Sequence, residues 1–256
     1  MTPNVTITYL GLDSALLSAL RGGLQIAFPD SSGPSRLRTA RLVAAVEEFG
    51  TLSQRKIVEQ MDWDNRYSDE DFIYGSEPNA FLVEQSSKLV GPVFSIAEGE
   101  GRNAVYLATL GLQVHCVDGS AVGLAKALKL ARTKGVEIQT HVADLAIYEP
   151  ATNCYMSVIS ISAHLPSSIR NRLYPLIERC ILPNGVFLLE AYSEDQLLRN
   201  TGGPKDLDML MTVSKIEREF PNLEPLLLHE TEREVCEGKL HTGVASVVQF
   251  IGRKPA

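Results

Sequence analysis

The stretch from Pro92 to Ala108 constrains the fold of this chain more than any other part of the sequence. An apolar run typical of a buried strand ends in two glycines, Gly99 and Gly101, and an amphipathic helical pattern follows directly. Glycine has no Cβ and tolerates positive φ, so both residues allow a tight turn and a close approach of the backbone to a ligand. The first N–H groups of the helix lack partners within the helix. We therefore predict a strand, a turn and a helix that together bind a nucleotide or a nucleotide-like ligand.

The charge of this turn restricts the choice of ligand. Glu98 and Glu100 flank Gly99, and two carboxylates in a poorly screened cleft would oppose a phosphate group. The chain of 256 residues also carries a formal net charge of −7, which argues against nucleic acid or any other partner bound mainly through phosphates. We expect a small-molecule partner, and at this turn a ligand that carries positive charge.

Strand and helix patterns alternate along the chain around this turn. Apolar or alternating runs predict further strands over 113–118, 136–142, 155–162 and 186–191. Helical patterns cover 79–89, 102–110, 121–134 and 167–182, and Pro183-Asn184-Gly185 is expected to end the last of these helices. This alternation predicts a Rossmann-like α/β fold with a mostly parallel sheet and helices on both faces. Ligands of such sheets bind at the carboxyl ends of the strands, where four residues of interest fall: Glu98, Asp118, Asp144 and His164.

Asp118 has two interpretations. It follows Gly101 by 17 residues, at about the distance where a doubly wound fold places the acid that accepts hydrogen bonds from ribose hydroxyls. It could instead cap the helix that begins near Ala121, but Ser120 is better placed for that role. We favour the ribose interpretation.

The last part of the chain departs from the alternation. A helix is expected over 206–219, and two strands over 226–235 and 241–251 read as a hairpin. Such a hairpin would add antiparallel strands to the edge of a parallel sheet.

The first part of the chain is set apart from this domain. Residues 1–60 hold two helical patterns separated by a breaker loop at 29–34, and we expect a helical cap or oligomerisation pair, or an extension upstream of a natural start at Met61. Residues 61–78 are rich in aromatic and charged side chains and contain the only tryptophan, Trp63. They form either a lid whose rings pack against a cationic ligand, or a loop that its rings pin to the core.

The cysteines and the apolar runs restrict the setting of the protein. The four cysteines, Cys116, Cys154, Cys180 and Cys236, are widely spaced and match neither a zinc site nor a disulfide framework. We find no apolar run of the roughly 20 residues that a membrane span needs, and no secretory signal. We expect a cytoplasmic protein, monomeric or homodimeric, with no metal and no membrane partner.

Two cofactors are compatible with the glycine turn. Gly99-x-Gly101-x-x-Ala104 matches the dinucleotide fingerprint, so an NAD(P)-dependent oxidoreductase has to be weighed. The flanking glutamates oppose a pyrophosphate, however, and the terminal hairpin is unlike a second mononucleotide half. S-adenosylmethionine fits better, because its sulfonium and amino groups are cationic, its ribose offers a diol to Asp118, and its adenine offers an edge to Asp144.

Several stretches carry a resemblance to a known family. They are Trp63-Asp-x-Arg-Tyr67, Tyr74-Gly-x-Glu-Pro78, Ala97-Glu-Gly-Glu-Gly-Arg-Asn-Ala104, Val117-Asp-x-Ser120, His164-Leu-Pro166 and Thr201-Gly-Gly-Pro204. With these, residues 61–256 resemble the class I S-adenosylmethionine-dependent methyltransferases, and within them the bacterial branch related to tellurite-resistance and thiopurine methyltransferases. One departure is that Ser95 and Ala97 stand where the class usually has an acid and a glycine.

The resemblance implies a fold, a cofactor and a set of site residues. The fold is a seven-stranded sheet with an antiparallel last strand, and the cofactor is S-adenosyl-L-methionine, with S-adenosyl-L-homocysteine as product. The residues expected to bind it are Trp63, Arg66, Tyr67, Tyr74, Glu98, Gly99, Gly101, Asn103, Asp118, Gly119, Ser120, Asp144 and Leu145. Glu98 is expected to take over the contact to the methionine amino group.

The acceptor side is less constrained by the sequence. Methyl transfer to a thiol or another chalcogen needs no strong base, whereas an oxygen or nitrogen acceptor needs one, and His164 is the best candidate. His164 could instead be a hydrogen-bonded turn residue. Arg170, Tyr192 and the loop at Gly202 are candidates to contact the acceptor, although Arg170 could be a surface residue and the loop a connector. Three functions stay in view: a small-molecule methyltransferase, an NAD(P)-dependent oxidoreductase, and a non-catalytic S-adenosylmethionine sensor.

Overall fold

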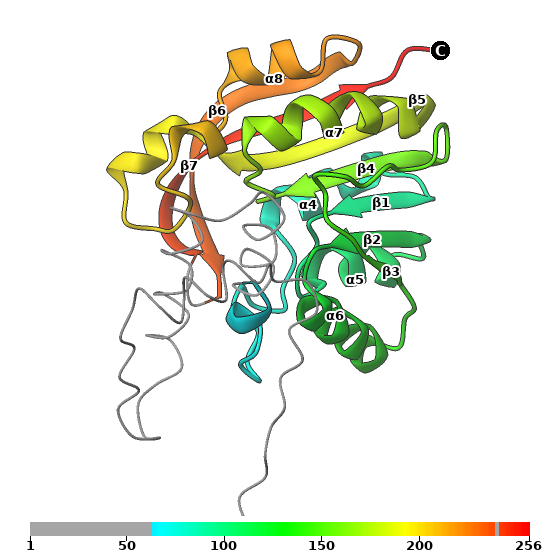
Figure 1. Cartoon of the computed structure of the whole chain (residues 1–256), viewed down its shortest axis with the longest axis vertical. Coiled ribbons are helices and arrows are strands. Elements are labelled where there is room, and N and C mark those ends of the chain that lie inside the picture. Colours follow the sequence, from blue (N-terminus) through cyan, green and yellow to red (C-terminus); the bar gives the residue numbers. More distant parts are fainter. Residues whose placement is uncertain (1–62, 239–240) are drawn as a thin grey trace, which may run out of the picture. The chain divides into compact units, whose positions relative to one another are not determined.

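A seven-stranded sheet forms the centre of the protein (Figure 1). The computed structural model describes residues 63–238 and 241–256, and the helices expected within residues 1–60 lie outside this part. The strand order is β3-β2-β1-β4-β5-β7-β6. The strands are β1 (Val93–Ile96), β2 (Val114–Asp118), β3 (Gln139–Val142), β4 (Tyr155–Ile161), β5 (Ile181–Tyr192), β6 (Glu224–Glu237) and β7 (His241–Arg253).

The first five strands are parallel, and β7 runs antiparallel to both of its neighbours, β5 and β6. This confirms the mostly parallel seven-stranded sheet with an antiparallel last strand. The order of strands reverses between β1 and β4, so their carboxyl ends flank the crevice where open α/β sheets bind ligands.

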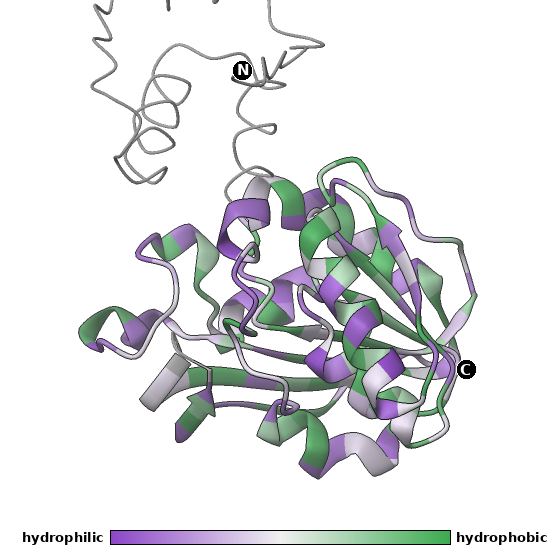
Figure 2. Ribbon diagram, turned by 90° about the horizontal axis from the view of Figure 1, so that it is seen from below, coloured by the Kyte–Doolittle hydropathy of each residue, from purple (hydrophilic) through white to green (hydrophobic). Residues whose placement is uncertain are grey.

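Helices cover both faces of the sheet (Figures 1 and 2). The helices are α4 (Ala80–Gln85), α5 (Arg102–Thr109), α6 (Ala121–Lys134), α7 (Ser167–Cys180) and α8 (Val213–Glu219), with 3₁₀ turns at Ser86–Lys88, Glu194–Leu198 and Leu207–Met209. Hydrophilic and hydrophobic residues both occur along these helices in Figure 2, as expected when one side of a helix packs on a sheet. No described helix is both long and apolar enough to cross a bilayer.

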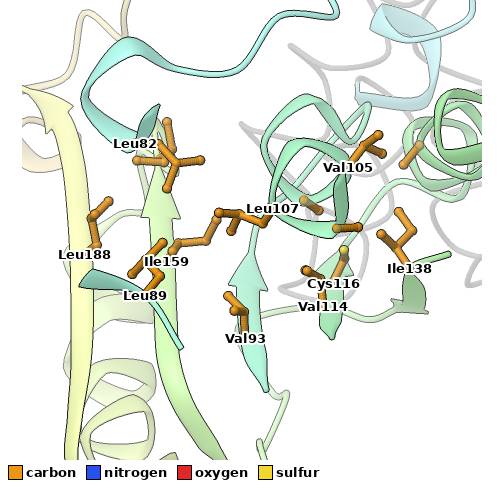
Figure 3. Close-up of a cluster of buried hydrophobic side chains, with 14 of the residues drawn as sticks. Leu82, Leu89, Val93, Val105, Leu107, Val114, Cys116, Ile138, Ile159 and Leu188 are labelled. Carbon is orange, nitrogen blue, oxygen red and sulfur yellow. The ribbon is translucent and has the colours of Figure 1, made fainter. Parts of the chain in front are cut away.

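Each face of the sheet has its own hydrophobic core. Leu82, Leu107 and Leu124 pack with Val93 beneath α4, α5 and α6, and Figure 3 shows part of this cluster. On the other face, residues of α7 and α8 pack with Phe94, the neighbour of Val93 in the same strand. Successive residues of a strand point to opposite faces, so a buried strand such as β1 feeds both cores and reads as a continuous apolar run.

The expected boundary between α7 and β5 was wrong. The helix ends at Cys180, and Pro183-Asn184-Gly185 lie within β5. Ile181 already pairs with Tyr155, the next pair is Ser157 with Val186, and the residues between them leave the ladder as an irregularity. Asn184 has φ 63°, so the turn residues Pro183-Asn184-Gly185 form an irregularity inside the strand rather than a turn before it.

Two predicted helices are shorter than expected. The 79–89 helix divides into α4 and a 3₁₀ turn, and the 206–219 helix into a 3₁₀ turn and α8. In both cases a side chain caps the helical start: Asn79 accepts the Leu82 N–H, and Thr212 accepts the Lys215 N–H.

Candidate functional site

Backbone strain gathers at the carboxyl ends of the two central strands. Ala97 follows β1 with φ 52°, and Ser162 follows β4 with φ 55°. The left-handed region costs a residue with a Cβ roughly 1–2 kcal/mol, and such strain clusters at functional sites. Ala97 stands where the resemblance implies a glycine, a residue that adopts positive φ without this cost.

Glu98 caps the helix that follows the glycine turn. Its Oε1 accepts the N–H groups of Asn103 at 3.1 Å and Ala104 at 2.9 Å, and its Oε2 accepts the hydroxyl of Ser95. Burial raises the pKa of Glu98, while the hydrogen bonds from Ala104 and Ser95 act in the opposite direction. Both carboxylate oxygens are therefore engaged by the protein itself.

Glu100 turns toward the aromatic segment. Its Oε1 lies 2.5 Å from Nζ of Lys126, and its Oε2 accepts the N–H groups of Ile73 at 2.8 Å and Tyr74 at 3.3 Å. The two glutamates therefore differ in their contacts, because Glu98 caps α5 and Glu100 holds residues 73–74.

The two glycines of the turn are needed for different reasons. A Cβ on Gly101 would lie 2.4 Å from Cβ of Ala127, so this glycine permits the close packing of α5 on α6. A Cβ on Gly99 would lie 2.7 Å from the hydroxyl of Tyr67. The aromatic segment therefore lies directly over the turn.

Asp118 lies at the carboxyl end of β2 and supports the glycine turn. Its Oδ2 accepts the N–H of Gly99 at 2.8 Å, and its Oδ1 accepts the N–H of Ser120 at 2.7 Å. Ser120 in turn caps α6 by accepting the Gly123 N–H at 3.0 Å, as expected. Burial raises the pKa of Asp118, and the two backbone hydrogen bonds oppose that effect. A carboxylate oxygen can accept more than one hydrogen bond, so Asp118 retains acceptor capacity.

Asp64 joins this group, and the sequence analysis missed it. Its Oδ1 accepts the hydroxyl of Ser120 at 2.5 Å and the N–H of Val122 at 3.3 Å. Asp64 is one acid among many in a charged segment, so composition gave no signal. The signal would have been its place between Trp63 and Arg66 in a stretch expected to cover the turn.

The aromatic segment packs as one group. The rings of Trp63 and Tyr67 stack at 5.5 Å, and Tyr74 meets Tyr67 edge-on at 6.3 Å. Arg66 lies over the Trp63 ring at 4.5 Å and donates from Nη1 to the Tyr74 hydroxyl at 3.2 Å. Burial raises the pKa of Tyr67, so its hydroxyl stays neutral at physiological pH. The structure brings these four predicted residues into one group, in which Tyr67 lies against Gly99.

The remaining predicted cofactor residues lie beside Asp118 or beneath it. A Cβ on Gly119 would have no atom nearer than the Ala143 carbonyl oxygen at 4.0 Å, so the backbone after Asp118 is open. Asp144 follows β3, and its Oδ1 accepts the Ala146 N–H at 2.8 Å. Leu145 is buried in the core.

Asn103 lies in the first turn of α5. Its Oδ1 accepts the Asn79 N–H at 2.9 Å, which ties the approach to α4 to the glycine turn.

The acceptor candidates behave differently from one another. The rings of His164 and Tyr192 stack at 5.0 Å with an interplanar angle of 3°. The Gly202 carbonyl accepts from Nε2 of Gln196 at 3.0 Å, and a Cβ on Gly203 would lie 2.6 Å from the Tyr192 ring. The histidine, the tyrosine and the glycine loop are thus brought together at the ends of β4 and β5. Burial raises the pKa of Tyr192, so its hydroxyl is also neutral.

Arg170 has a structural role, which corrects its assignment to the acceptor. It is 1% exposed, and its guanidinium donates to Glu219 from Nε at 2.9 Å and from Nη2 at 3.2 Å. Its Nη1 donates to the carbonyls of Leu165 and Asp208. These contacts tie α7 to α8. Arg172 instead lies near the surface and bonds to the loop at 147–149.

A buried ionic cluster links the site to the terminal hairpin, and the sequence analysis did not predict it. Arg233 pairs with Glu190 at 2.5 Å and Glu237 at 2.8 Å, and Arg102 pairs with Glu237 at 2.6 Å. The Asn79 amide donates to both glutamates. These charges come from α5, β5 and β6, which are far apart in the sequence, so only the fold brings the three elements together. Among the described residues, no group of three or more His, Cys, Asp or Glu could hold a metal ion.

Comparison with known proteins agrees with this architecture. A family described as "Methyltransferase domain" matches residues 93–185, which span β1 to the irregularity in β5. No curated protein matches the chain in sequence.

Solved structures share the fold at low sequence identity. A structure described under "Conversion of a Disulfide Bond into a Thioacetal Group during Echinomycin Biosynthesis" has a TM-score of 0.63 and 17% identity, over 77% of this chain and 92% of that chain. The N-methyltransferase NodS from Bradyrhizobium japonicum WM9, in complex with S-adenosyl-L-homocysteine, has a TM-score of 0.59 and 12% identity, over 77% and 98%. TehB from Haemophilus influenzae has a TM-score of 0.52 and 17% identity, over 77% and 67%. At these identities the likeness shows the fold alone.

The edge of the sheet fits S-adenosylmethionine. It offers the acceptor capacity of Asp118 beside the open backbone of Gly119, and an aromatic segment with Trp63 and Tyr67 that lies over the turn. Residues 93–185 therefore form a methyltransferase domain, and the site at this edge supports S-adenosylmethionine as the methyl donor.

Proposed function

We propose that the protein transfers the methyl group of S-adenosylmethionine to a small-molecule acceptor with a soft nucleophile, a thiol or another chalcogen. The observation that carries this proposal is the state of the carboxylates near Tyr192. Glu190 and Glu237 both pair with Arg233, so neither carboxylate is available as a general base, and His164 is left as the basic side chain beside Tyr192. A thiolate is nucleophilic without such a base, because it is already ionised when it attacks.

The cofactor supplies a methyl group activated by its sulfonium charge, and the chain's task is to hold and shield it. We assign the ribose to Asp118 and Gly119, and the adenine to Asp144 and Leu145. The cover is formed by Trp63, Arg66, Tyr67 and Tyr74, over the turn at Gly99 and Gly101.

Glu98 receives a revised role in this proposal. Because Asn103, Ala104 and Ser95 engage its oxygens, we assign it to fixing the start of α5 rather than to a direct contact with the methionine amino group. We assign a supporting role to Ser120 as well, because its N–H donates to the carboxylate of Asp118.

His164 and Tyr192 are our candidates for the acceptor pocket, together with the loop at Gly202. The His164 ring stacks on a neutral tyrosine, which fixes its plane. An unprotonated imidazole nitrogen can accept a proton, so we assign to His164 the orientation of a thiol and the removal of its proton when the thiol arrives protonated. The resemblance to the branch of tellurite-resistance and thiopurine methyltransferases supports a chalcogen acceptor, and one structural neighbour is described in terms of sulfur chemistry.

The wider setting is part of the same proposal. We assign residues 61–256 to the methyltransferase domain and 1–60 to a helical cap or extension. We propose that the protein acts in the cytoplasm, as a monomer or homodimer, on a small molecule rather than on nucleic acid.

The proposal is tested with S-adenosylmethionine that carries a labelled methyl group and a panel of thiols, selenols, tellurite, thiopurines and amines. We expect label in the chalcogen acceptors. His164→Ala should lower turnover most at a pH below the acceptor pKa and least above it, because a thiolate no longer needs a base. Label in amines alone would refute the soft-nucleophile assignment. Binding of the cofactor with no transfer to any acceptor would favour a sensor.

A further inference from the structure

Lys126 occupies a cage of oxygen atoms between α6 and the aromatic segment. Its Nζ lies 3.4 Å from the carbonyl oxygen of Tyr67, 2.9 Å from that of Asp69 and 2.7 Å from that of Asp71. The fourth oxygen is Oε1 of Glu100, at 2.5 Å. Three backbone carbonyls and one carboxylate thus surround a single ammonium group.

Glu100 completes the connection from the side of the glycine turn. While its Oε1 pairs with Lys126, its Oε2 accepts the N–H groups of Ile73 and Tyr74. The ring of Phe72 also lies 5.0 Å from Nζ of Lys126. Residues 67–74 are therefore held at their carbonyls by α6 and at their N–H groups by the turn between β1 and α5.

Burial shields the ion pair between Lys126 and Glu100 from water. The side chains of Lys126 and Glu100 are 13% and 3% exposed. An ion pair shielded from water is weakened little by salt, and removal of one partner leaves the other charge uncompensated. The ammonium group has three N–H donors and no acceptor, which matches a cage made only of oxygens.

The held segment carries the rings that cover the glycine turn. Tyr67 begins it and Tyr74 ends it, and the Tyr67 hydroxyl lies over Gly99. Movement of the carbonyl cage would therefore move the residues to which we assign the cover.

We propose that Lys126 and Glu100 are positioning residues that hold residues 67–74 over the turn and thereby set the affinity for S-adenosylmethionine. This inference rests on the proposed role of the aromatic segment in cofactor binding. Neither side chain touches the reacting atoms, so the pair should affect cofactor affinity and leave the rate at saturating cofactor nearly unchanged.

The test compares Lys126→Ala with Lys129→Ala, an exposed lysine on the same helix. Calorimetry with S-adenosyl-L-homocysteine should show at least about tenfold weaker binding for Lys126→Ala and unchanged binding for Lys129→Ala. The rate at saturating S-adenosylmethionine should stay within about twofold of wild type. Glu100→Gln should weaken binding in the same direction. Trp63 is the only tryptophan and stacks on Tyr67, so the fluorescence of the unliganded variants reports whether Tyr67 has moved relative to Trp63.

Chemical rescue separates positioning from general destabilisation. n-Butylammonium added to Lys126→Ala should restore affinity for S-adenosyl-L-homocysteine, whereas n-butyltrimethylammonium should not, because it has the charge but no N–H donors. Equal rescue by both ions would overturn the positioning role of Lys126 and Glu100, and so would binding by Lys126→Ala as tight as wild type. Either result would leave the proposed function standing. Failure of the wild type to bind S-adenosyl-L-homocysteine would overturn both this positioning role and the proposed function.

Discussion

Substitution of Arg170 by methionine is expected to destabilise the fold and to leave the acceptor site unaffected. Arg170 is 1% exposed and Glu219 is 6% exposed, so the change leaves the buried carboxylate of Glu219 without its arginine partner. Breaking a buried pair by removing one partner costs about 3–5 kcal/mol, more than an exposed pair contributes. For a chain of this size, that corresponds to a decrease in melting temperature of about 6–20 °C.

Urea denaturation of wild type and Arg170→Met measures this cost. Arg172→Met is the matched control, because Arg172 lies on the same helix and pairs with an exposed glutamate, and its effect should stay below about 1 kcal/mol. The double variant Arg170→Met/Glu219→Leu should recover part of the loss, since replacing both charges with apolar groups is often neutral or stabilising. Stability within about 1 kcal/mol of wild type, together with a raised KM for the acceptor, would refute the structural assignment.

Three further predictions follow from the glycine turn and its supports. Gly101→Ala should destabilise the fold by about 2–5 kcal/mol, because a Cβ there is strained at φ 91° and lies 2.4 Å from Ala127. The control Gly111→Ala has φ 83° but open space around the Cβ, so it should cost only about 1–2 kcal/mol. Thermal unfolding measures both losses. Ala97→Gly should raise the unfolding free energy by about 0.5–1 kcal/mol, since relief of strain at φ 52° exceeds the entropic cost of glycine, and a decrease would contradict this. The pKa of Asp118 is raised in the folded chain, so the contribution of its protonation to stability is full below its unfolded value and is lost as pH rises through its folded value. Wild type should therefore lose stability between about pH 4 and about pH 7, whereas Asp118→Asn, which does not titrate at this position, should not lose this contribution. Denaturation at both pH values should show the free energy of unfolding of Asp118→Asn rising relative to that of wild type, and the opposite trend would indicate a lowered pKa.

The order of strands and helices could be predicted because hydrophobic periodicity is a local property of the sequence. The strand at 93–96 and the helix after Gly101 follow from such patterns. The boundary near Pro183 could not be predicted, because turn residues signal a change of direction and do not say whether it occurs between elements or within a strand. The pairing of Ile181 with Tyr155 decided that point.

The polar residues of the site also divide into those whose position could be predicted from the sequence and those whose contacts could not. The placement of Asp118 and His164 follows from topology, since the carboxyl ends of parallel strands share one edge. The direction of Glu98, Glu100 and Arg170 depends on partners that the fold supplies, such as the start of α5, Lys126 and Glu219. Charge and spacing therefore predict that these residues lie near an edge or a helix, but they do not predict which protein groups the side chains contact.

The central claim is that Asp118 and the glycine turn form a site for S-adenosylmethionine. The most direct test is calorimetric titration of wild type and Asp118→Ala with S-adenosyl-L-homocysteine and with NADH. We predict binding of S-adenosyl-L-homocysteine by wild type, at least about tenfold weaker binding by Asp118→Ala, and no binding of NADH. Tight binding of NADH with no response to S-adenosyl-L-homocysteine would contradict the account.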